Sequence, residues 1–299
     1  MNKFSFIYLI LVYLLFALFT SLSNIDLYYQ IIGSLSLILL FGIPHGAIDN
    51  ILLLSESNIS RNTFYTSYIA SIIIYIFLWM IAPLYSFIFF LIISAYHFGE
   101  SQLNNYKLNT KTNKITYFIW GLFLISTLLF YNKIELINLF NQFQDTKSLS
   151  IIFENQSIKI IFIISNLGVL SLLIKNTFKK NISSDSLKKE LFLILLIHIS
   201  FFLFPAIICF TLYFVVLHSL KVLIEEFKYL KNKNKKFNLI NFIITLSPYT
   251  FISILTIIAF LFMSKYGYLN ISILLLSIIS ISVITLPHSV TMAKFYKRI

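Results

Sequence analysis

The run FSFIYLILVYLLFALFTSL, which extends from Phe4 to Leu22, contains no charged residue. A transmembrane helix needs about 20 consecutive, mostly apolar residues, so this stretch is long enough to cross a bilayer. Comparable runs recur along the chain, and we expect spans over 4–22, 28–48, 63–82, 83–102, 114–131, 158–175, 188–204, 205–224, 238–263 and 269–290. The sequence therefore predicts an all-α, polytopic integral membrane helix bundle with about ten transmembrane helices.

The composition of the chain excludes an ordinary soluble protein. Hydrophobic residues make up 59% of its 299 residues and charged residues only 11%, whereas a soluble domain carries about 25% charged residues. No loop is long enough to hold a soluble domain, so we expect a single transmembrane domain over residues 1–299. The single cysteine, Cys209, excludes an intrachain disulfide.

The net charge of +12 would suit a nucleic-acid partner. The basic residues lie between apolar spans, however, so we expect no nucleic-acid partner. Alternate loops hold most of them, and an excess of Lys and Arg marks the cytoplasmic side of a membrane protein. This basic set comprises Lys3, Arg61, Lys107, Lys111, Lys114, Lys175, Lys179, Lys180, Lys188, Lys189, Lys221, Lys228, Lys231, Lys233, Lys235, Lys236, Lys294, Lys297 and Arg298. The distribution predicts that both termini are cytoplasmic.

The membrane is expected to be a bacterial inner (plasma) membrane, because richness in Ile, Asn and Lys is typical of an AT-rich bacterial genome. The protein would then contact membrane lipid along most of its spans. An alternative for the first span is a cleaved signal peptide, since Lys3 precedes it and the small residues Ser21 and Ser23 follow. We favour an uncleaved helix, and the orientation of the remaining spans is the same in either case.

Five histidines lie in or at the ends of predicted spans, where polar groups are costly and indicate function. Four of them occur in short motifs: PHGAID at 44–49, AYHFGE at 95–100, LHS at 217–219 and LPH at 286–288. These residues are His45, His97, His218 and His288, and the fifth, His198, stands alone. In the predicted orientation the four motif histidines occupy the cytoplasmic halves of spans that run in the same direction. They can therefore converge on one metal ion if their helices cluster.

Imidazole suits such a site because it binds iron, copper or zinc without adding negative charge to an apolar surrounding. Asp49 follows His45 by four residues and Glu100 follows His97 by three, so each carboxylate would share a helix face with a histidine. A carboxylate that accepts the second ring N–H fixes the orientation of a ligand histidine. We therefore place Asp49, Glu100 and Ser219 behind the ligands, and expect no catalytic residue beyond the metal centre.

Each of these residues also has a purely structural interpretation. His198 would serve equally well in a hydrogen bond between helices. His288 lies close to the expected membrane surface, and Asp49 and Glu100 are also compatible with ordinary interfacial charges. The hypothesis of a metal centre depends on the four motif histidines coming together.

The four motifs, in this order, also resemble a known family. Pro44–Asp49 resembles its PHGAxD signature and Ala95–Glu100 its AYHFGE signature. The segment 205–219 resembles the stretch that ends in HSxxH, and 286–288 resembles the C-terminal LPH. Across residues 40–292 the chain is therefore similar to the Brp/Blh family of membrane beta-carotene 15,15'-dioxygenases.

The resemblance implies an Fe(II) enzyme that cleaves beta-carotene with O2 at the central double bond, giving two all-trans-retinal molecules for retinal-binding rhodopsins. His45, His97 and His218 match three of the family's iron ligands. The fourth expected ligand is the second His of HSxxH, where this chain has Val222. Three outcomes stay open: His288 or His198 completes the site, three histidines suffice as in other non-haem iron centres, or the activity has been lost.

Other functions are compatible with the residues to different degrees. A retinal-binding opsin needs a lysine inside a span for its Schiff base, and the lysines here fall in loops or at span ends. Membrane desaturases bind iron through HxxxH and HxxHH clusters, which are absent from the sequence. A haem protein with two axial histidines and a transporter with His45, Asp49, His97 and Glu100 as an ion relay remain as alternatives.

Overall fold

The computed structural model describes residues 3–22, 25–54, 59–106, 108, 113–154 and 156–297, and every regular element in these ranges is helical. Within them, nine helical stretches are long and apolar enough to cross a membrane. They are α1 (Lys3–Ser21), α2 to α3 (Leu27–Leu54), α4 (Arg61–Ile81), α5 (Pro83–Leu103), α6 (Asn113–Tyr131), α9 (Ser157–Phe178), α11 to α12 (Ala206–Lys233), α13 (Leu239–Lys265) and α14 (Ile273–Phe295). The predicted all-α membrane bundle is confirmed.

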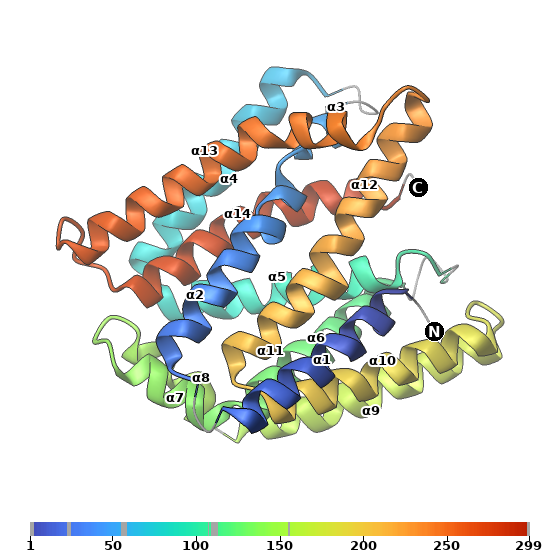
Figure 1. The fold of residues 1–299 in the computed structure, drawn as a ribbon, viewed down its shortest axis with the longest axis horizontal. Helices are drawn as coiled ribbons and strands as arrows, with labels where there is room; N and C mark the ends of the chain where they lie inside the picture. Colours follow the sequence, from blue (N-terminus) through green and yellow to red (C-terminus); the bar gives the residue numbers. More distant parts are fainter. Residues whose placement is uncertain are drawn as a thin grey trace.

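The remaining expected span, 188–204, corresponds to α10 (Ser184–Leu203), which is not among those nine. Its first turns carry Asp185, Lys188, Lys189 and Glu190, so its apolar part is shorter. Nevertheless, α10 lies beside α9 and runs the length of the bundle (Figure 1). The bundle thus contains a tenth long helix whose first turns are charged.

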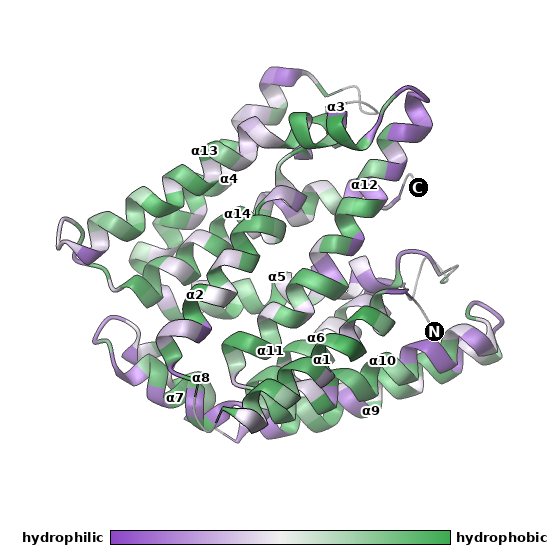
Figure 2. Ribbon diagram, in the orientation of Figure 1, coloured by the Kyte–Doolittle hydropathy of each residue, from purple (hydrophilic) through white to green (hydrophobic). Residues whose placement is uncertain are grey.

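The polar parts of the chain lie at the two ends of the bundle. Hydrophilic residues gather in the loops and helix ends, while the middle of the long helices is mostly hydrophobic (Figure 2). The longer connection between α6 and α9 forms three short helices: α7 (Lys133–Asn141), η3 (Lys147–Leu149) and α8 (Ile151–Glu154). Ser23 of the signal-peptide alternative and three members of the basic set, Lys107, Lys111 and Arg298, lie outside the described residues.

The first helix belongs to the bundle. Tyr8 is fully buried and its hydroxyl is hydrogen-bonded to the Ser200 hydroxyl of α10, with 2.5 Å between the oxygens. Lys221 is also buried, although the sequence assigns it to a loop, and its ammonium group donates to the main-chain carbonyls of Ser101 and Gln102. These carbonyls lie near the C-terminus of α5, where a positive charge complements the free carbonyl groups of the helix.

Two glycines bring α5 and α6 into backbone contact. A Cβ atom on Gly99 would lie 1.8 Å from the carbonyl oxygen of Tyr117, and one on Gly121 would lie 1.7 Å from that of Ala95. Small residues permit such close approach between membrane helices, where van der Waals packing supplies much of the association energy. The contact fixes α5, which carries the AYHFGE motif, against α6.

Two of the membrane-spanning segments are irregular in the region of the histidine motifs. After α2 (Leu27–Leu37), the chain forms a π-helical turn η1 (Ile38–Gly42) and a 3-10 turn η2 (Pro44–Gly46) before α3 (Asp49–Leu54). Pro44 lacks the N–H that a continuous helix needs, which explains the break. The second segment passes from α11 (Ala206–Leu212) through a π-helical stretch η4 (Tyr213–Ser219) to α12 (Leu220–Lys233). Such π-turns often occur at functional sites.

Candidate metal centre

The four motif histidines meet in the interior of the bundle. His45 comes from η2, His97 from α5, His218 from η4 and His288 from α14, and all four are buried. Their ring centroids form a closed four-membered circuit. The separations are 5.1 Å for His45–His218, 4.9 Å for His218–His97, 5.0 Å for His97–His288 and 4.8 Å for His288–His45. We refer to these residues as the histidine ring.

The spacing of the nitrogens is close to that of ligands on a single ion. His45, His97 and His288 each offer one ring nitrogen, and these nitrogens lie within 4.8 Å of one another. Metal–nitrogen bonds of about 2.1 Å place ligand nitrogens up to about 4.2 Å apart. A small movement of these three imidazoles would therefore bring them to one ion. His218 is not in this set of nitrogens, and its ring lies at the fourth corner, with its centroid 5.1 Å from that of His45 and 4.9 Å from that of His97. The cluster can bind a metal.

The hydrogen bonding of the ring supports the same interpretation. Within the described part of the chain, both nitrogens of His97, both nitrogens of His218 and Nε2 of His288 are buried without a hydrogen-bond partner. Leaving a buried polar atom unpaired costs about 1–3 kcal/mol, so native structures rarely retain several at one place. A metal ion that accepts one lone pair from each of these three imidazoles would remove the penalty for three of the five nitrogens, and the remaining N–H of His97 and of His218 would gain nothing from the ion. The donor set therefore fits a resident metal.

Two ring members have partners that orient them. Nδ1 of His288 donates to Oδ1 of Asp49 across 2.9 Å, which leaves Nε2 without a partner. The other oxygen of Asp49 accepts a hydrogen bond of 3.1 Å from the Tyr68 hydroxyl. Nδ1 of His45 hydrogen-bonds to the carbonyl oxygen of Gly42. A carboxylate or carbonyl behind a histidine in this way is the common arrangement around metal ligands.

Asp49 thus contacts His288, whereas its position four residues after His45 suggested His45. The helix break between the two residues is the cause, because an unbroken α-helix is needed for that shared face. Gly46, inside the break, makes room for the new partner. A Cβ atom there would lie 3.3 Å from Nδ1 of His288.

The other two residues expected behind the ligands do not contact histidine through hydrogen bonds. Oε1 of Glu100 accepts from the Tyr96 hydroxyl at 3.1 Å, and Oε2 is buried without a partner. The Ser219 hydroxyl, next to His218, is likewise buried and unpaired. Both residues lie one turn or less from a ring histidine in sequence, but among the described residues the hydrogen bonds to ring histidines come from Asp49 and the carbonyl of Gly42.

His198 lies outside the histidine ring. Its Nε2 bonds to Oδ1 of Asn166 at 2.8 Å and its Nδ1 to the Tyr131 hydroxyl at 3.1 Å. These bonds join α10 to α9 and α6, so His198 links three helices. Of the residues considered for the fourth corner of the site, the structure brings His288 to the ring and keeps His198 away from it.

Val222, at the position of the missing histidine, is completely buried. It belongs to an apolar cluster with Ile48, Leu52, Phe242 and Met292, among others. Because η4 ends at Ser219 and α12 begins at Leu220, Val222 is in a different type of helix from His218. Position 222 is therefore occupied by a side chain packed among apolar neighbours.

Aromatic rings next to the histidine ring were not singled out as site residues by the sequence analysis. Phe214 stacks on His218 with 5.6 Å between centroids and 23° between planes, and Phe98 meets His218 edge-on at 4.9 Å. Both residues lie within the motif segments, four residues before His218 and one after His97. Their short sequence distance from a motif histidine was the signal that could have identified them. An aromatic residue at such a position, however, is more often part of the hydrophobic core than of a functional site.

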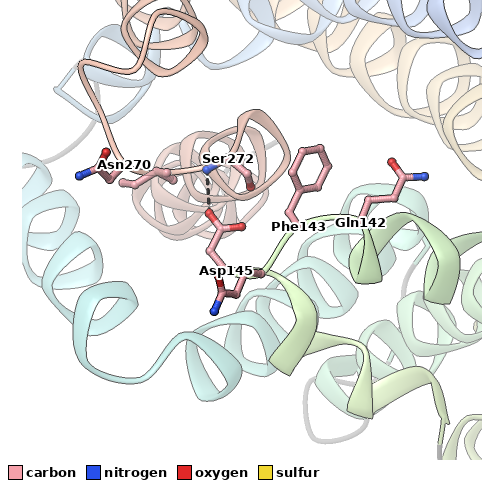
Figure 3. A pocket seen from close by; sticks show the side chains of 7 residues that line it. Gln142, Phe143, Asp145, Asn270 and Ser272 are labelled. Carbon is pink, nitrogen blue, oxygen red and sulfur yellow. Dashed lines mark hydrogen bonds between the residues drawn. The ribbon is translucent and has the colours of Figure 1, made fainter.

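An open pocket with a volume of about 460 Å³ lies elsewhere. It is lined by the loop after α7 and by the residues before α14, and Oδ2 of Asp145 accepts the N–H of Ser272 there at 2.7 Å (Figure 3). His288 follows Ser272 by sixteen residues, which is about 24 Å along a helix. This pocket is therefore separate from the histidine ring, and Asp145 anchors the start of α14.

Comparison with known protein families gives one result. A family model described as beta-carotene 15,15'-dioxygenase matches residues 36–296, a range that includes the whole histidine ring and Asp49. Comparisons with curated proteins and with solved structures give no match.

Proposed function

Because the chain belongs to the beta-carotene 15,15'-dioxygenase family, we propose that it cleaves beta-carotene with O2 at the central 15,15' double bond. One C=C bond breaks, each new end receives one atom of O2, and two molecules of all-trans-retinal form. The family assignment supports a carotenoid dioxygenase in general. The observation that carries the metal-dependent mechanism is the set of buried, unpaired ring nitrogens on His97, His218 and His288.

We propose Fe(II) as the metal, held by His45, His97, His218 and His288. A donor set made only of neutral imidazoles suits iron, copper or zinc, and oxygen-dependent cleavage selects a redox-active metal among these. When bound, Fe(II) would supply the activation of O2 that this reaction requires. In this assignment His288 provides the fourth ligand that the family motif would place at Val222, so the substitution there is compatible with activity.

The surrounding residues have three tasks. Asp49 orients His288 and balances part of the positive charge of the centre through its hydrogen bond. The apolar side chains around the ring exclude water from reactive oxygen species. The helices also hold the polyene with its central bond beside the centre, which is catalysis by positioning. A long polyene dissolves in the bilayer, so a site inside a membrane bundle can receive it without passage through water.

The proposed location is the bacterial inner membrane, with both termini in the cytoplasm. Both ends of the chain lie at the same side of the bundle (Figure 1), and an even number of crossings requires this. The loops on that side contain most of the basic set, as cytoplasmic loops do. Retinal released there would supply a retinal-binding rhodopsin, which is the partner that the reaction product suggests.

The decisive experiment is expression in a bacterium engineered to make beta-carotene, with the colour of the cells and their retinal content read by chromatography. The purified protein is assayed for iron and its absorption spectrum is recorded. We expect bleaching, retinal and bound non-haem iron in the wild type, and loss of all three with His97→Ala. Unchanged carotene in cells that contain the protein and sufficient iron would refute the proposal. A haem absorption band or proton-coupled uptake would favour one of the alternative functions.

A further inference from the structure

The helix that carries His218 also carries a row of stacked aromatic rings. Phe210 and Phe214 are nearly parallel, with centroids 5.5 Å apart and planes at 11°. Phe214 in turn stacks on His218 at 5.6 Å and 23°. The three residues are spaced by four, so the row covers about 12 Å of helix rise and ends at the histidine ring. We refer to Phe210 and Phe214 as the phenyl row.

The phenyl row is more accessible than the histidine to which it leads. Phe210 and Phe214 are partly exposed, whereas His218 and the neighbouring Phe98 are buried. The adjoining helix α2 packs beside α11, and the two lie next to each other on the near face of the bundle in Figure 1. Leu37 at the end of α2 and Leu40 in η1 are 45% and 63% exposed, so this segment presents apolar side chains at the outer surface of the bundle.

One glycine fixes the position of the inner ring. A Cβ atom on Gly42 would lie 2.6 Å from Cε1 of Phe214. Any other residue at 42 would displace the phenyl ring, which also meets His45 edge-on at 5.6 Å and Phe98 at 6.3 Å. Gly42 and the neighbouring side chains therefore hold Phe214 at one place beside the histidine ring.

We propose that the phenyl row binds one half of the polyene and sets which double bond reaches the metal centre. The inference rests on the proposed function and adds the residues that position its substrate. A conjugated polyene is flat, apolar and polarisable, and its π face can pack against the edges of these stacked rings, as aromatic rings do in edge-to-face pairs. It would enter from the bilayer at the seam between α2 and α11 and advance along the row. Phe210 and Phe214 are positioning residues, since neither would contact the metal.

This role makes a prediction about products as well as rates. Without the ring of Phe214, the polyene loses its last aromatic contact before the centre and can bind in shifted registers. Cleavage at a neighbouring double bond has the same balance, because one C=C bond is replaced by two C=O bonds and both atoms of O2 are used. The products then differ in length, whereas central cleavage gives two identical molecules. Replacement of a residue that matters only for folding would lower the yield without altering the ratio of unequal carbonyl products to retinal.

The test compares Phe214→Ala and Phe210→Ala with Phe162→Ala, using purified protein with beta-carotene in detergent. Phe162 is a matched control, because it stacks on Phe130 at 4.2 Å and 10° in a separate part of the bundle. We expect the two row variants to keep wild-type iron content, to raise KM about 3- to 10-fold, and to form unequal carbonyl products. The control should keep the wild-type product ratio and KM.

The outcomes separate this inference from the proposed function. If the wild type binds no iron and leaves beta-carotene intact, the proposed function itself fails. If the wild type makes retinal and both row variants match Phe162→Ala in KM and product ratio, the phenyl row does not position the substrate. Should Phe214→Ala lose iron, Phe210→Ala decides the matter, because its ring contacts that of Phe214 rather than a histidine.

Discussion

Asp49 and His288 are 239 residues apart in the sequence and share a buried hydrogen bond of 2.9 Å. The bond connects the segment that follows the Pro44 break to the last membrane helix, α14. It also orients His288, the one member of the histidine ring that the family resemblance did not match to an iron ligand. The relationship gives the first prediction.

Replacement of Asp49 by Asn should weaken iron binding about 10- to 100-fold, as is typical when the partner of a ligand histidine is changed. The amide keeps the size of the side chain but removes its charge, so His288 loses its preferred acceptor. Iron content measured at several free-iron concentrations checks this. Asp145→Asn is the control, because Asp145 accepts a main-chain N–H far from the ring. Equal iron affinity in both variants would contradict the assigned role of Asp49.

The second prediction separates the two histidines that sequence analysis left open. His288→Ala should abolish iron binding and retinal formation, because it opens the histidine ring. His198→Ala should keep both and lower stability by about 1.2 kcal/mol, because it removes two hydrogen bonds between membrane helices that are typically worth about 0.6 kcal/mol each. Iron analysis and thermal unfolding of the two purified variants measure these effects. Iron retained in full by His288→Ala would show that three histidines suffice.

The third prediction concerns the missing motif histidine. Val222→His should not raise iron content or retinal yield, and it should destabilise the protein by about 1–3 kcal/mol, because a larger polar ring enters a filled apolar cluster. Val222→Ile provides an apolar control of increased size. A clear gain of activity in Val222→His would mean that position 222 contributes a ligand and that His288 has another task.

The fourth prediction tests the scaffold beneath His97. Gly99→Ala should lower stability by at least about 1–3 kcal/mol and reduce iron content, because the new methyl group would collide with the carbonyl of Tyr117 and move α5 from α6. Gly33→Ala is a matched control, since a Cβ atom there would meet nothing within 4 Å. Thermal unfolding in detergent compares the two. Equal stability of both variants would show that the α5–α6 contact tolerates separation.

Much of the fold could be read from the sequence, because a membrane span leaves a strong local signal. The apolar runs predicted the long helices. The predicted span 188–204 is helical too, but its helix α10 is not among the nine long apolar helices of the described residues, since Asp185, Lys188, Lys189 and Glu190 in its first turns shorten its apolar part. The identities of the four motif histidines were also visible, because a polar residue inside an apolar run is conspicuous.

The partners of those histidines were decided by tertiary structure. Sequence spacing paired Asp49 with His45 and Glu100 with His97, but the break at Pro44–Gly46 turns Asp49 toward His288, and Glu100 accepts from Tyr96. The π-helical stretch before Leu220 contains no proline or glycine from which the sequence could have predicted it. Spacing predicts neighbours only along a regular helix.

The sequence by itself therefore determined which segments are long and apolar enough to cross a membrane and which polar residues they carry. The packing of η2, α5, η4 and α14 decided that His288 joins His45, His97 and His218, while His198 bonds to Asn166 and Tyr131. The physical reason is that insertion depends on the hydropathy of each segment alone. A site shared by four helices depends on their rotation and close approach, which long-range contacts such as Gly99 against Tyr117 establish.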